Sequence, residues 1–266
     1  MLYGNVFRAS EFGLIADVSF SGAIDESNDM YLAPTSNTEF LGGNSHATFL
    51  SQKYDGQQEL TVSLTHNPCE NDSMKFTEHE ARAINRVLTG KKGYDWLKII
   101  KSGENTDTDY YYYATVSNIS YQYLGKDVIG VLVTFKLDGG QAYSEEQTSY
   151  IMARAGRPFY IYNNSDEIYD YTRSVVTIVP QDGGTLGITN ITDNNWYTEL
   201  KNCSAGEKII MDCKNEVLSS SIRTLPLNDF NLHWIRLLPD KNEFSINMDA
   251  TITFKHRVVR KTGFID

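Results

Sequence analysis

The chain of 266 residues is 41% apolar and 12% aromatic, which is enough to form a core and excludes a disordered chain. At about 100–200 residues per domain, this length predicts two domains. Abundant Tyr, Phe, Thr, Val and Ile beside only six Pro favour β-structure. A formal net charge of −10 argues against general, sequence-independent binding of nucleic acid, because phosphate neutralisation requires clustered Lys and Arg.

The first residues and the cysteines indicate a cytoplasmic protein. The start lacks the basic and apolar stretches of a signal peptide, and no window approaches the length of a membrane span. Cys69, Cys203 and Cys213 are scattered without a CxxC spacing, which predicts reduced thiols.

The first clear elements are a strand and a helix. Residues 59–66 alternate apolar and polar side chains, which predicts a half-buried strand. Thr77 and Glu80 then form a capping box, with Phe76 at the staple position before it. The apolar stripe of the predicted helix consists of Ala81, Ile84, Val87 and Leu88. Gly90 stands where the C-terminal cap is expected.

Further strands complete the first half. Residues 96–100 predict a strand and residues 102–109 a polar loop. Residues 110–123 and 128–135 predict two long strands joined in a hairpin around Gly125. The first domain is therefore predicted as a β-sandwich or split-barrel-like domain with one packed helix.

A polar stretch at residues 138–149 separates the halves, and we place a linker at residues 144–160. The predicted domains are thus residues 1–143 and residues 161–266. Short strands separated by turns predict a β-sandwich for the second domain, at residues 174–179, 185–189, 208–213, 230–237 and 244–254.

A search for chemistry finds no local signature. No metal-ligand spacing joins the five histidines, which are His46, His66, His79, His233 and His256. The paired glycines at 42–43 and 183–184 lack the setting of a phosphate loop, and no G-x-S-x-G elbow occurs. We predict no catalytic, metal-binding or cofactor-binding residues, no cofactor and no enzymatic activity, and the sequence assigns no binding residues.

Several side chains leave alternatives open. Four consecutive tyrosines at 110–113 alternate on a strand, so two core and two rim tyrosines are favoured over a stacking platform. Trp196 could line a sugar site, whereas Trp234 lies in an apolar run and is predicted as core. Solvated surface charge is favoured over a catalytic pair for the carboxylates Glu78, Glu80, Glu145 and Glu146. A polar strand face is favoured over a partner contact for the basic segment 255–261.

Several segments together form a distributed pattern without a rigid catalytic motif. They are the opening Phe12-Gly13-Leu14-Ile15, the helix region 76–88 with 93–97, the long hairpin 110–119 with 130–135, and in the second half 206–212, 228–231 and the closing strand. With the order of the elements, this pattern resembles the distal tail protein family of long-tailed phages and prophages of Gram-positive bacteria, and the resemblance spans nearly the whole chain.

The resemblance implies a homo-hexameric ring around a DNA channel and an outward, galectin-like C-terminal sandwich. It implies a baseplate hub at the virion tail tip, assembled in the host cytoplasm, without specific nucleic-acid or membrane binding. The implied partners are the major tail tube protein, the tape-measure protein, the tail-tip or tail-associated lysin protein, and receptor-binding or baseplate proteins.

Asn231, His233 and Arg236 cluster in the sequence without the galectin sugar-binding spacing, which puts sugar binding in doubt. The main alternative is a free carbohydrate-binding β-sandwich module, and a β-sandwich glycosidase is a further one. We expect an acidic channel that repels DNA, with acidic segments at 70–72 and 104–109 as candidate lumen residues.

Overall fold

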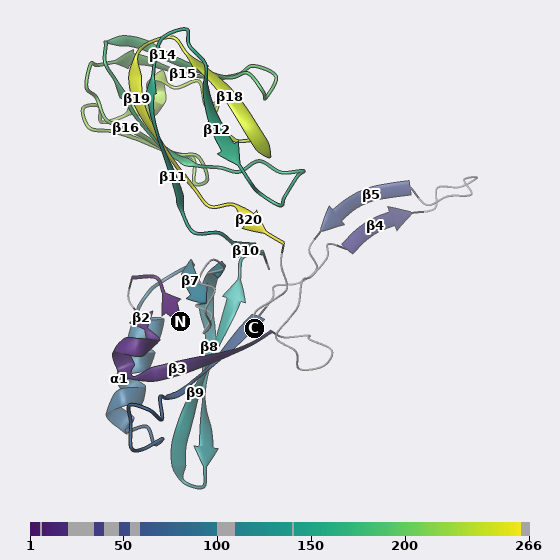
Figure 1. Cartoon of the computed structure of the whole chain (residues 1–266), viewed down its shortest axis with the longest axis vertical. Coiled ribbons are helices and arrows are strands. Elements are labelled where there is room, and N and C mark those ends of the chain that lie inside the picture. Colours follow the sequence, from purple (N-terminus) through teal and green to yellow (C-terminus); the bar gives the residue numbers. More distant parts are fainter. Residues whose placement is uncertain are drawn as a thin grey trace. The chain divides into compact units, whose positions relative to one another are not determined.

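The computed structural model describes residues 1–5, 7–20, 35–39, 48–53, 59–99, 110–139 and 141–261. The chain forms two compact units (Figure 1). Unit 1 comprises Met1–Ala142 with Lys261–Asp266, and unit 2 comprises Tyr143–Arg260. Antiparallel strands dominate both units, which confirms the predicted mainly β class.

Unit 1 is built on one antiparallel sheet with the strand order β2-β1-β7-β8-β9-β6-β3. β10 (Ala142–Tyr143) belongs to the same sheet and pairs with β8 beside this order. A separate antiparallel pair, β4 and β5, also lies in unit 1. The bounds are β1 Leu2–Tyr3, β2 Phe7–Arg8, β3 Leu14–Phe20, β4 Thr35–Glu39, β5 Thr48–Lys53, β6 Glu59–His66, β7 Asp95–Ile99, β8 Tyr110–Leu124 and β9 Asp127–Leu137.

The predicted strand at residues 59–66 is confirmed as β6. Its alternate residues Leu60, Val62 and Leu64 are completely buried, and the residues between them are half-buried. This period-two burial is the physical consequence of side chains that alternate across the sheet. β6 pairs with β3 on one side and β9 on the other, so it lies within the sheet.

The helix α1 (Glu78–Thr89) begins at the predicted capping box. The backbone N–H of Glu80 donates to Thr77 Oγ1 over 3.2 Å, and the backbone N–H of Thr77 donates to Glu80 Oε2 over 2.7 Å. Ile84 and Leu88 are buried in the core of unit 1, where Phe76 joins them. In Figure 1, α1 lies against the sheet of unit 1. A short 3-10 helix, η1 (Ala9–Phe12), precedes β3.

The predicted long hairpin is confirmed as β8 and β9. Leu124 pairs with Asp127, which leaves Gly125 and Lys126 as the two turn residues. Gly125 has a φ of 65°, in the left-handed region that glycine adopts without steric cost. The predicted loop at 102–109 lies outside the described residues.

Unit 2 is a sandwich of two antiparallel sheets around one core. One sheet has the order β11-β19-β13-β16-β17 and the other has the order β12-β18-β14-β15. The bounds are β11 Gln147–Ala153, β12 Phe159–Asn163, β13 Val175–Pro180, β14 Gly184–Asn190, β15 Trp196–Cys203, β16 Ile209–Asp212, β17 Val217–Ser220, β18 Asp240–Ile246, β19 Ala250–His256 and β20 Val259–Arg260, with a 3-10 helix η3 at Pro226–Asp229.

The predicted linker at residues 144–160 is not observed. β11 and the first residues of β12 lie in this segment, and β11 pairs with β19 along its whole length. Only residues 144–149 have the polar composition of a linker, and the strand that follows from Gln147 is fixed by a partner far along the chain. The assignment of functional domains to residues 1–143 and 161–266 stays a prediction.

Two predicted strands also need correction. Residues 244–254 do not form one strand, because the chain leaves one sheet with β18 and enters the other with β19. At the corner, Asn247 Oδ1 accepts from the Gly187 N–H and Asp249 Oδ1 accepts from the Ala155 N–H. Residues 230–237 make isolated bridges only at Phe230 and Leu237. Leu232 between them has a φ of 62°, which breaks the extended backbone.

Candidate functional site

The described histidines belong to no metal-binding group. Among the described residues, no group of three or more His, Cys, Asp or Glu side chains could hold a metal ion. His66 is buried, with Nδ1 at 2.9 Å from the Ser73 carbonyl oxygen and its ring against Phe76. His256 is buried in unit 2. His46 lies outside the described residues. No helix in the described ranges is long and apolar enough to cross a membrane.

The cysteines are free thiols in different surroundings. Cys69 is exposed, whereas Cys203 and Cys213 are buried in unit 2. Burial raises the pKa of the Cys203 thiol and raises the pKa of Cys213 to about 12. A thiol needs a lowered pKa to act as a nucleophile near neutral pH, so neither buried cysteine has that character.

The four tyrosines on β8 divide between two faces, as the alternation predicts. Tyr110 and Tyr112 pack on the core of unit 1. On the other face, the Tyr113 ring contacts Trp96 with centroids 5.0 Å apart, and Lys98 Nζ lies 5.2 Å from the Tyr111 ring centroid. Tyr111 and Tyr112 are both buried, so the run offers no exposed stacking platform for sugars or bases.

Unit 2 brings together side chains that the sequence separates widely. The Arg236 guanidinium lies 4.0 Å from the Tyr171 ring centroid and 3.8 Å from that of Trp196. The Trp196 indole also stacks on the His233 imidazole, with centroids 4.5 Å apart. Buried Asp193 accepts from Arg236 Nε over 2.6 Å. We call Tyr171, Asp193, Trp196, His233 and Arg236 the aromatic–arginine cluster.

Hydrogen bonds from the cluster and from the neighbouring Thr198 and Asn231 hold the irregular segment 230–237 against β15. Trp196 Nε1 donates to the Trp234 carbonyl over 3.0 Å, and Thr198 Oγ1 donates to the His233 carbonyl over 2.8 Å. Asn231 Nδ2 donates to the Tyr197 carbonyl over 3.0 Å, and His233 Nδ1 lies 2.9 Å from the same oxygen. Side chains thus supply the hydrogen bonds that a regular strand would make through its backbone.

This arrangement explains how the candidate sugar residues are used. His233 and Arg236 both lie against Trp196, a contact that their positions in the sequence did not predict, and Asn231 is bonded to backbone. A sugar-binding tryptophan must offer an open ring face, and here an imidazole and a guanidinium both lie against the half-buried indole and take up stacking surface. Trp234 is confirmed as a core residue, at 8% exposure. No pattern in the sequence pointed to Tyr171 and Asp193, which join the other residues only in the folded unit.

Several of the charged candidates have partners within their own units. Glu80 belongs to the helix cap, and Glu146 lies 3.4 Å from Lys255. In the basic segment 255–261, Arg257 donates to the Ser144 carbonyl and Arg260 to the Asn164 carbonyl. Arg257 and Arg260 thus bind this segment to neighbouring backbone within unit 2.

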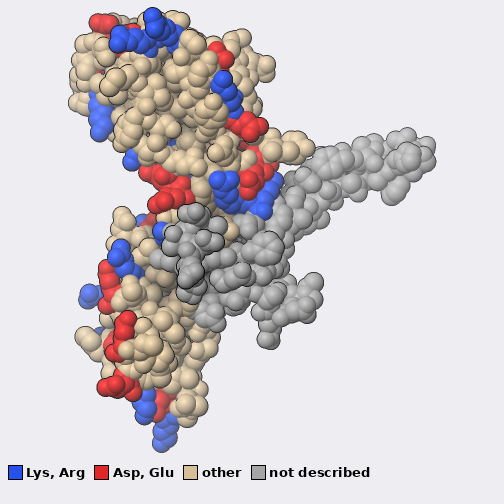
Figure 2. Space-filling model, in the orientation of Figure 1, with Lys and Arg blue, Asp and Glu red and all other residues tan. Residues whose placement is uncertain are grey.

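Charges of both signs are interspersed on the visible surface. Figure 2 shows blue and red side chains of described residues in small groups on the face drawn, without an extended basic patch there. Glu70 and Asp72, in the candidate lumen segment 70–72, are exposed in unit 1. The other candidate, 104–109, lies outside the described residues.

These features define the class of the protein: a mainly β chain of two compact units with one packed α-helix in the described part. A family model described as the phage tail protein N-terminal domain matches residues 5–139. A second model, described as the phage tail C-terminal domain, matches residues 141–256. The chain belongs to this family of phage tail proteins.

Solved structures share the fold over nearly the whole chain. SPP1 Dit (gp 19.1), described as a paradigm of the hub adsorption apparatus in Gram-positive infecting phages, is 14% identical with a TM-score of 0.58, covering 91% of this chain and 99% of Dit. A chain of the phage P2 baseplate in its activated conformation with Ca is 10% identical with a TM-score of 0.54, covering 94% and 100%. The same baseplate with Sr gives 11% identity and the same TM-score and coverage. No curated protein matches the sequence.

Proposed function

We propose that this chain is a structural, non-enzymatic subunit of the hub at the tip of a phage tail. One observation carries the proposal: both halves match phage tail domains, and nearly the whole chain shares the fold of a hub protein. Because the likeness includes both units, it is more specific than a single β-sandwich, a fold that serves many unrelated functions.

In this proposal, unit 1 closes with five other copies into a hexameric ring around a channel for DNA. Unit 2 is a galectin-like sandwich that faces outward and takes part in host attachment. The cores of the two units share no residue, which supports a division of roles between them. The half-buried indole of Trp196, with stacking surface taken up by His233 and Arg236, supports a sandwich used for protein contacts over one that binds sugar.

The proposed partners are the tail tube protein, the tape-measure protein, the tail-tip protein or tail-associated lysin, and receptor-binding or baseplate proteins. Such a subunit would be assembled in the cytoplasm of the bacterial host and then reside at the virion tail tip. It would require no cofactor and no membrane.

The net charge supports a passive conduit. Six copies that each carry −10 would form a strongly acidic ring, and a lumen of that sign would repel passing DNA. The exposed Glu70 and Asp72 are proposed as lumen or rim residues. A basic lumen would instead bind DNA in a salt-sensitive manner.

Negative-stain images of the purified full chain test the ring. We expect ring-shaped particles with a central hole at high protein concentration or in the presence of the tail tube and tail-tip proteins. A strictly monomeric species beside those partners would contradict the hub.

A binding titration with labelled duplex DNA tests the conduit. We expect no measurable binding even at low ionic strength. Micromolar affinity that disappears with added salt would contradict an acidic lumen while leaving the ring itself untouched.

A further inference from the structure

β11 is an edge strand without the features that normally protect an edge. Among the described residues it pairs only with β19, through seven consecutive residue pairs with no bulge. Its sequence, Gln-Thr-Ser-Tyr-Ile-Met-Ala, contains no charge and no proline. Proteins usually protect long edges with charges, prolines, bulges or covering segments, because an open edge pairs with other strands.

The other edges of the unit 2 sheets differ from β11. β17 has only four residues. β15 is covered, because the segment 230–237 bonds to it and Arg223 donates to the Lys201 carbonyl. β12 is short, and Lys241 lies over its Tyr160 at 3.8 Å from the ring centroid. β11 is thus the long, uncharged and uncovered edge among these four.

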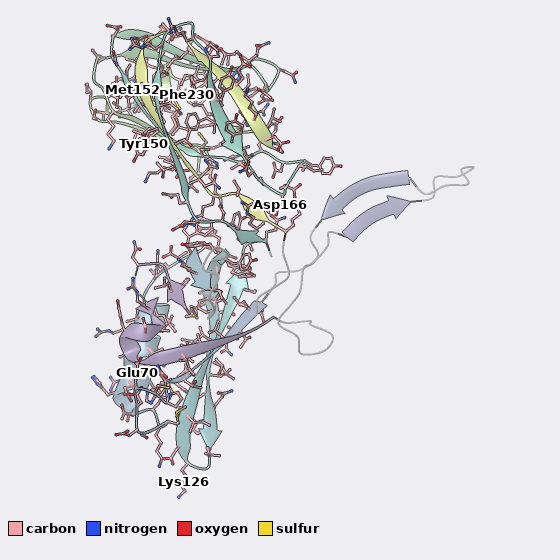
Figure 3. All side chains as sticks on the ribbon, viewed as in Figure 1. Glu70, Lys126, Tyr150, Met152, Asp166 and Phe230 are labelled. Carbon is pink, nitrogen blue, oxygen red and sulfur yellow. The ribbon has the colours of Figure 1, made fainter. Side chains whose placement is uncertain are left out.

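Large side chains project from β11 into solvent. Tyr150 is 77% exposed and Met152 is 86% exposed, and both are labelled in Figure 3. Ile151, which points to the other face, is only half-buried. The strand therefore presents exposed apolar side chains on the outer face of its sheet, next to its open backbone edge.

The two ends of β11 carry opposite charges. Glu146, just before the strand, has 46% of its side chain exposed and a 3.4 Å contact with Lys255. Arg154, just after the strand, has 71% of its side chain exposed and a 3.5 Å contact with Asp249. Read from 146 to 154, the segment has an acidic start, an uncharged middle and a basic end.

We propose that β11 is a docking strand for β11 of a second copy of this chain. The two strands run antiparallel about a two-fold axis at Tyr150. Each Glu146 then lies opposite Arg154 of the other copy, each Thr148 opposite Met152, and the two Tyr150 residues face each other. These positions all share one parity along the strand, so the opposed side chains lie on the same face of the joined sheet.

Charge complementarity selects this partner over others. Two chains of net charge −10 repel each other in general, so a contact between copies needs a local match of sign. The antiparallel arrangement supplies that match twice by symmetry, as in an isologous interface. A two-fold contact does not join neighbours around a ring. The two-fold contact can join two free chains or two whole rings. The proposed contact at β11 is therefore independent of whether the chain forms a ring.

Cysteine cross-linking tests the register. In a Cys69→Ser background, Tyr150→Cys places two cysteines opposite each other, where Cβ atoms lie about 4.5–5.5 Å apart and a disulfide can close. Met152→Cys is the matched control, because Met152 is as exposed but its two copies are offset by four residues, about 13 Å. Oxidation should convert the Y150C chain to a disulfide-linked dimer on a denaturing gel and leave M152C unlinked. Equal linking of both variants, or linking of neither, would overturn the proposal.

Particle mass tests the contact itself. Tyr150→Lys places two like charges on the two-fold axis and should prevent the two copies of β11 from pairing. The mass of the particle that the full-length chain forms at high concentration should then fall by half, from a dimer to a single chain or from a pair of rings to a single ring. Tyr169→Lys, at an 89% exposed site in a loop of the same unit, should leave the mass unchanged. Glu146→Arg and Arg154→Glu should each weaken pairing, and the double swap should restore it. A mass that is the same in wild type and Y150K, or no restoration by the swap, would refute the two-fold contact.

Discussion

Glu207 is completely buried and is held in place by three groups of unit 2. It accepts from Arg223 Nε over 2.7 Å, from Ser220 Oγ over 2.5 Å and from the Ser204 N–H over 2.9 Å. Burial alone would raise the pKa of this carboxyl, but the bonds from Ser220, Ser204 and Arg223 outweigh it and lower the pKa below its ordinary value of 4.5. The carboxylate is therefore a charged anchor for the loops around η3.

Removing the cation tests this anchor. Arg223→Met should destabilise the protein by about 3–5 kcal/mol, because it leaves Glu207 buried and charged without its partner. Urea unfolding followed by tryptophan fluorescence measures the change. The exposed pair of Arg260 and Asp166 is the control, and Arg260→Met should cost less than about 1 kcal/mol. Similar losses in both variants would contradict the anchoring role.

His256 makes the stability of the protein depend on pH in a higher pH range than Glu207 does. Burial lowers its pKa below the ordinary value of 6.5, and a contact with the Tyr162 backbone opposes this only in part. The folded protein therefore favours the neutral ring. The stability that this provides is present above the unfolded-state pKa and is lost as the pH falls from about 6.5 through the folded-state pKa.

His256→Leu removes this titration. Urea midpoints of wild type should fall as the pH is lowered from about 7 to about 5, and those of the variant should fall less. The loss linked to Glu207 should occur at lower pH, below about 4.5, because its pKa is depressed from that value. Parallel curves for wild type and His256→Leu would show that the histidine does not carry the dependence.

At the scale of elements, the N-terminus of α1 depends on a reciprocal pair of bonds. Thr77→Ala removes the hydroxyl that accepts from the Glu80 N–H and should cost about 1 kcal/mol of stability. Thr89→Ala, at the other end of the helix, is the matched control, because Thr89 Oγ1 only donates to the Asn85 carbonyl within the helix. Chemical denaturation of both variants measures the difference, and an equal cost would contradict the capping role.

The elements predicted correctly are those specified by neighbouring residues. α1 has its cap in sequence, and the hairpin of β8 and β9 has a glycine at its turn. β11 was missed because its inward residues Ser149, Ile151 and Ala153 give little apolar periodicity, and pairing with distant β19 stabilises it. The break between β18 and β19 was missed because the alternation continues through the corner, where bonds to Gly187 and Ala155 turn the chain.

The aromatic–arginine cluster was also only partly predictable, because it joins residues that are distant in the sequence. Trp196, His233 and Arg236 could be suspected from residue type. Tyr171 and Asp193 could not, since only the folding of unit 2 brings them to the same guanidinium. Whether the residues bind a ligand or hold a segment depends on which ring faces are already covered, and composition does not contain that information.

At the scale of the whole molecule, the two hydrophobic cores are separate. The core of unit 1 centres on β6, β9 and α1, whereas the core of unit 2 lies between its two sheets, and the two share no residue. Packing is a short-range interaction, so damage to one core does not directly weaken the other.

Calorimetry of core variants tests this separation. Leu64→Ala in unit 1 and Ile252→Ala in unit 2, both at completely buried positions, should each cost about 2–5 kcal/mol. Each variant should lower the midpoint of one of two thermal transitions and leave the other in place. A single transition that both variants shift equally would show that the units unfold as one.

The entry and exit of unit 2 lie side by side. The Ser144 N–H donates to the Val258 carbonyl over 2.9 Å, and Gln147 at the start of β11 pairs with His256 at the end of β19. A module whose two ends meet can be spliced out and replaced by another without moving the rest of the chain. Recombination between phages that exchanges this segment would need to match only two adjacent junctions. The sandwich can thus diversify as a cassette while the sheet of unit 1 keeps its sequence.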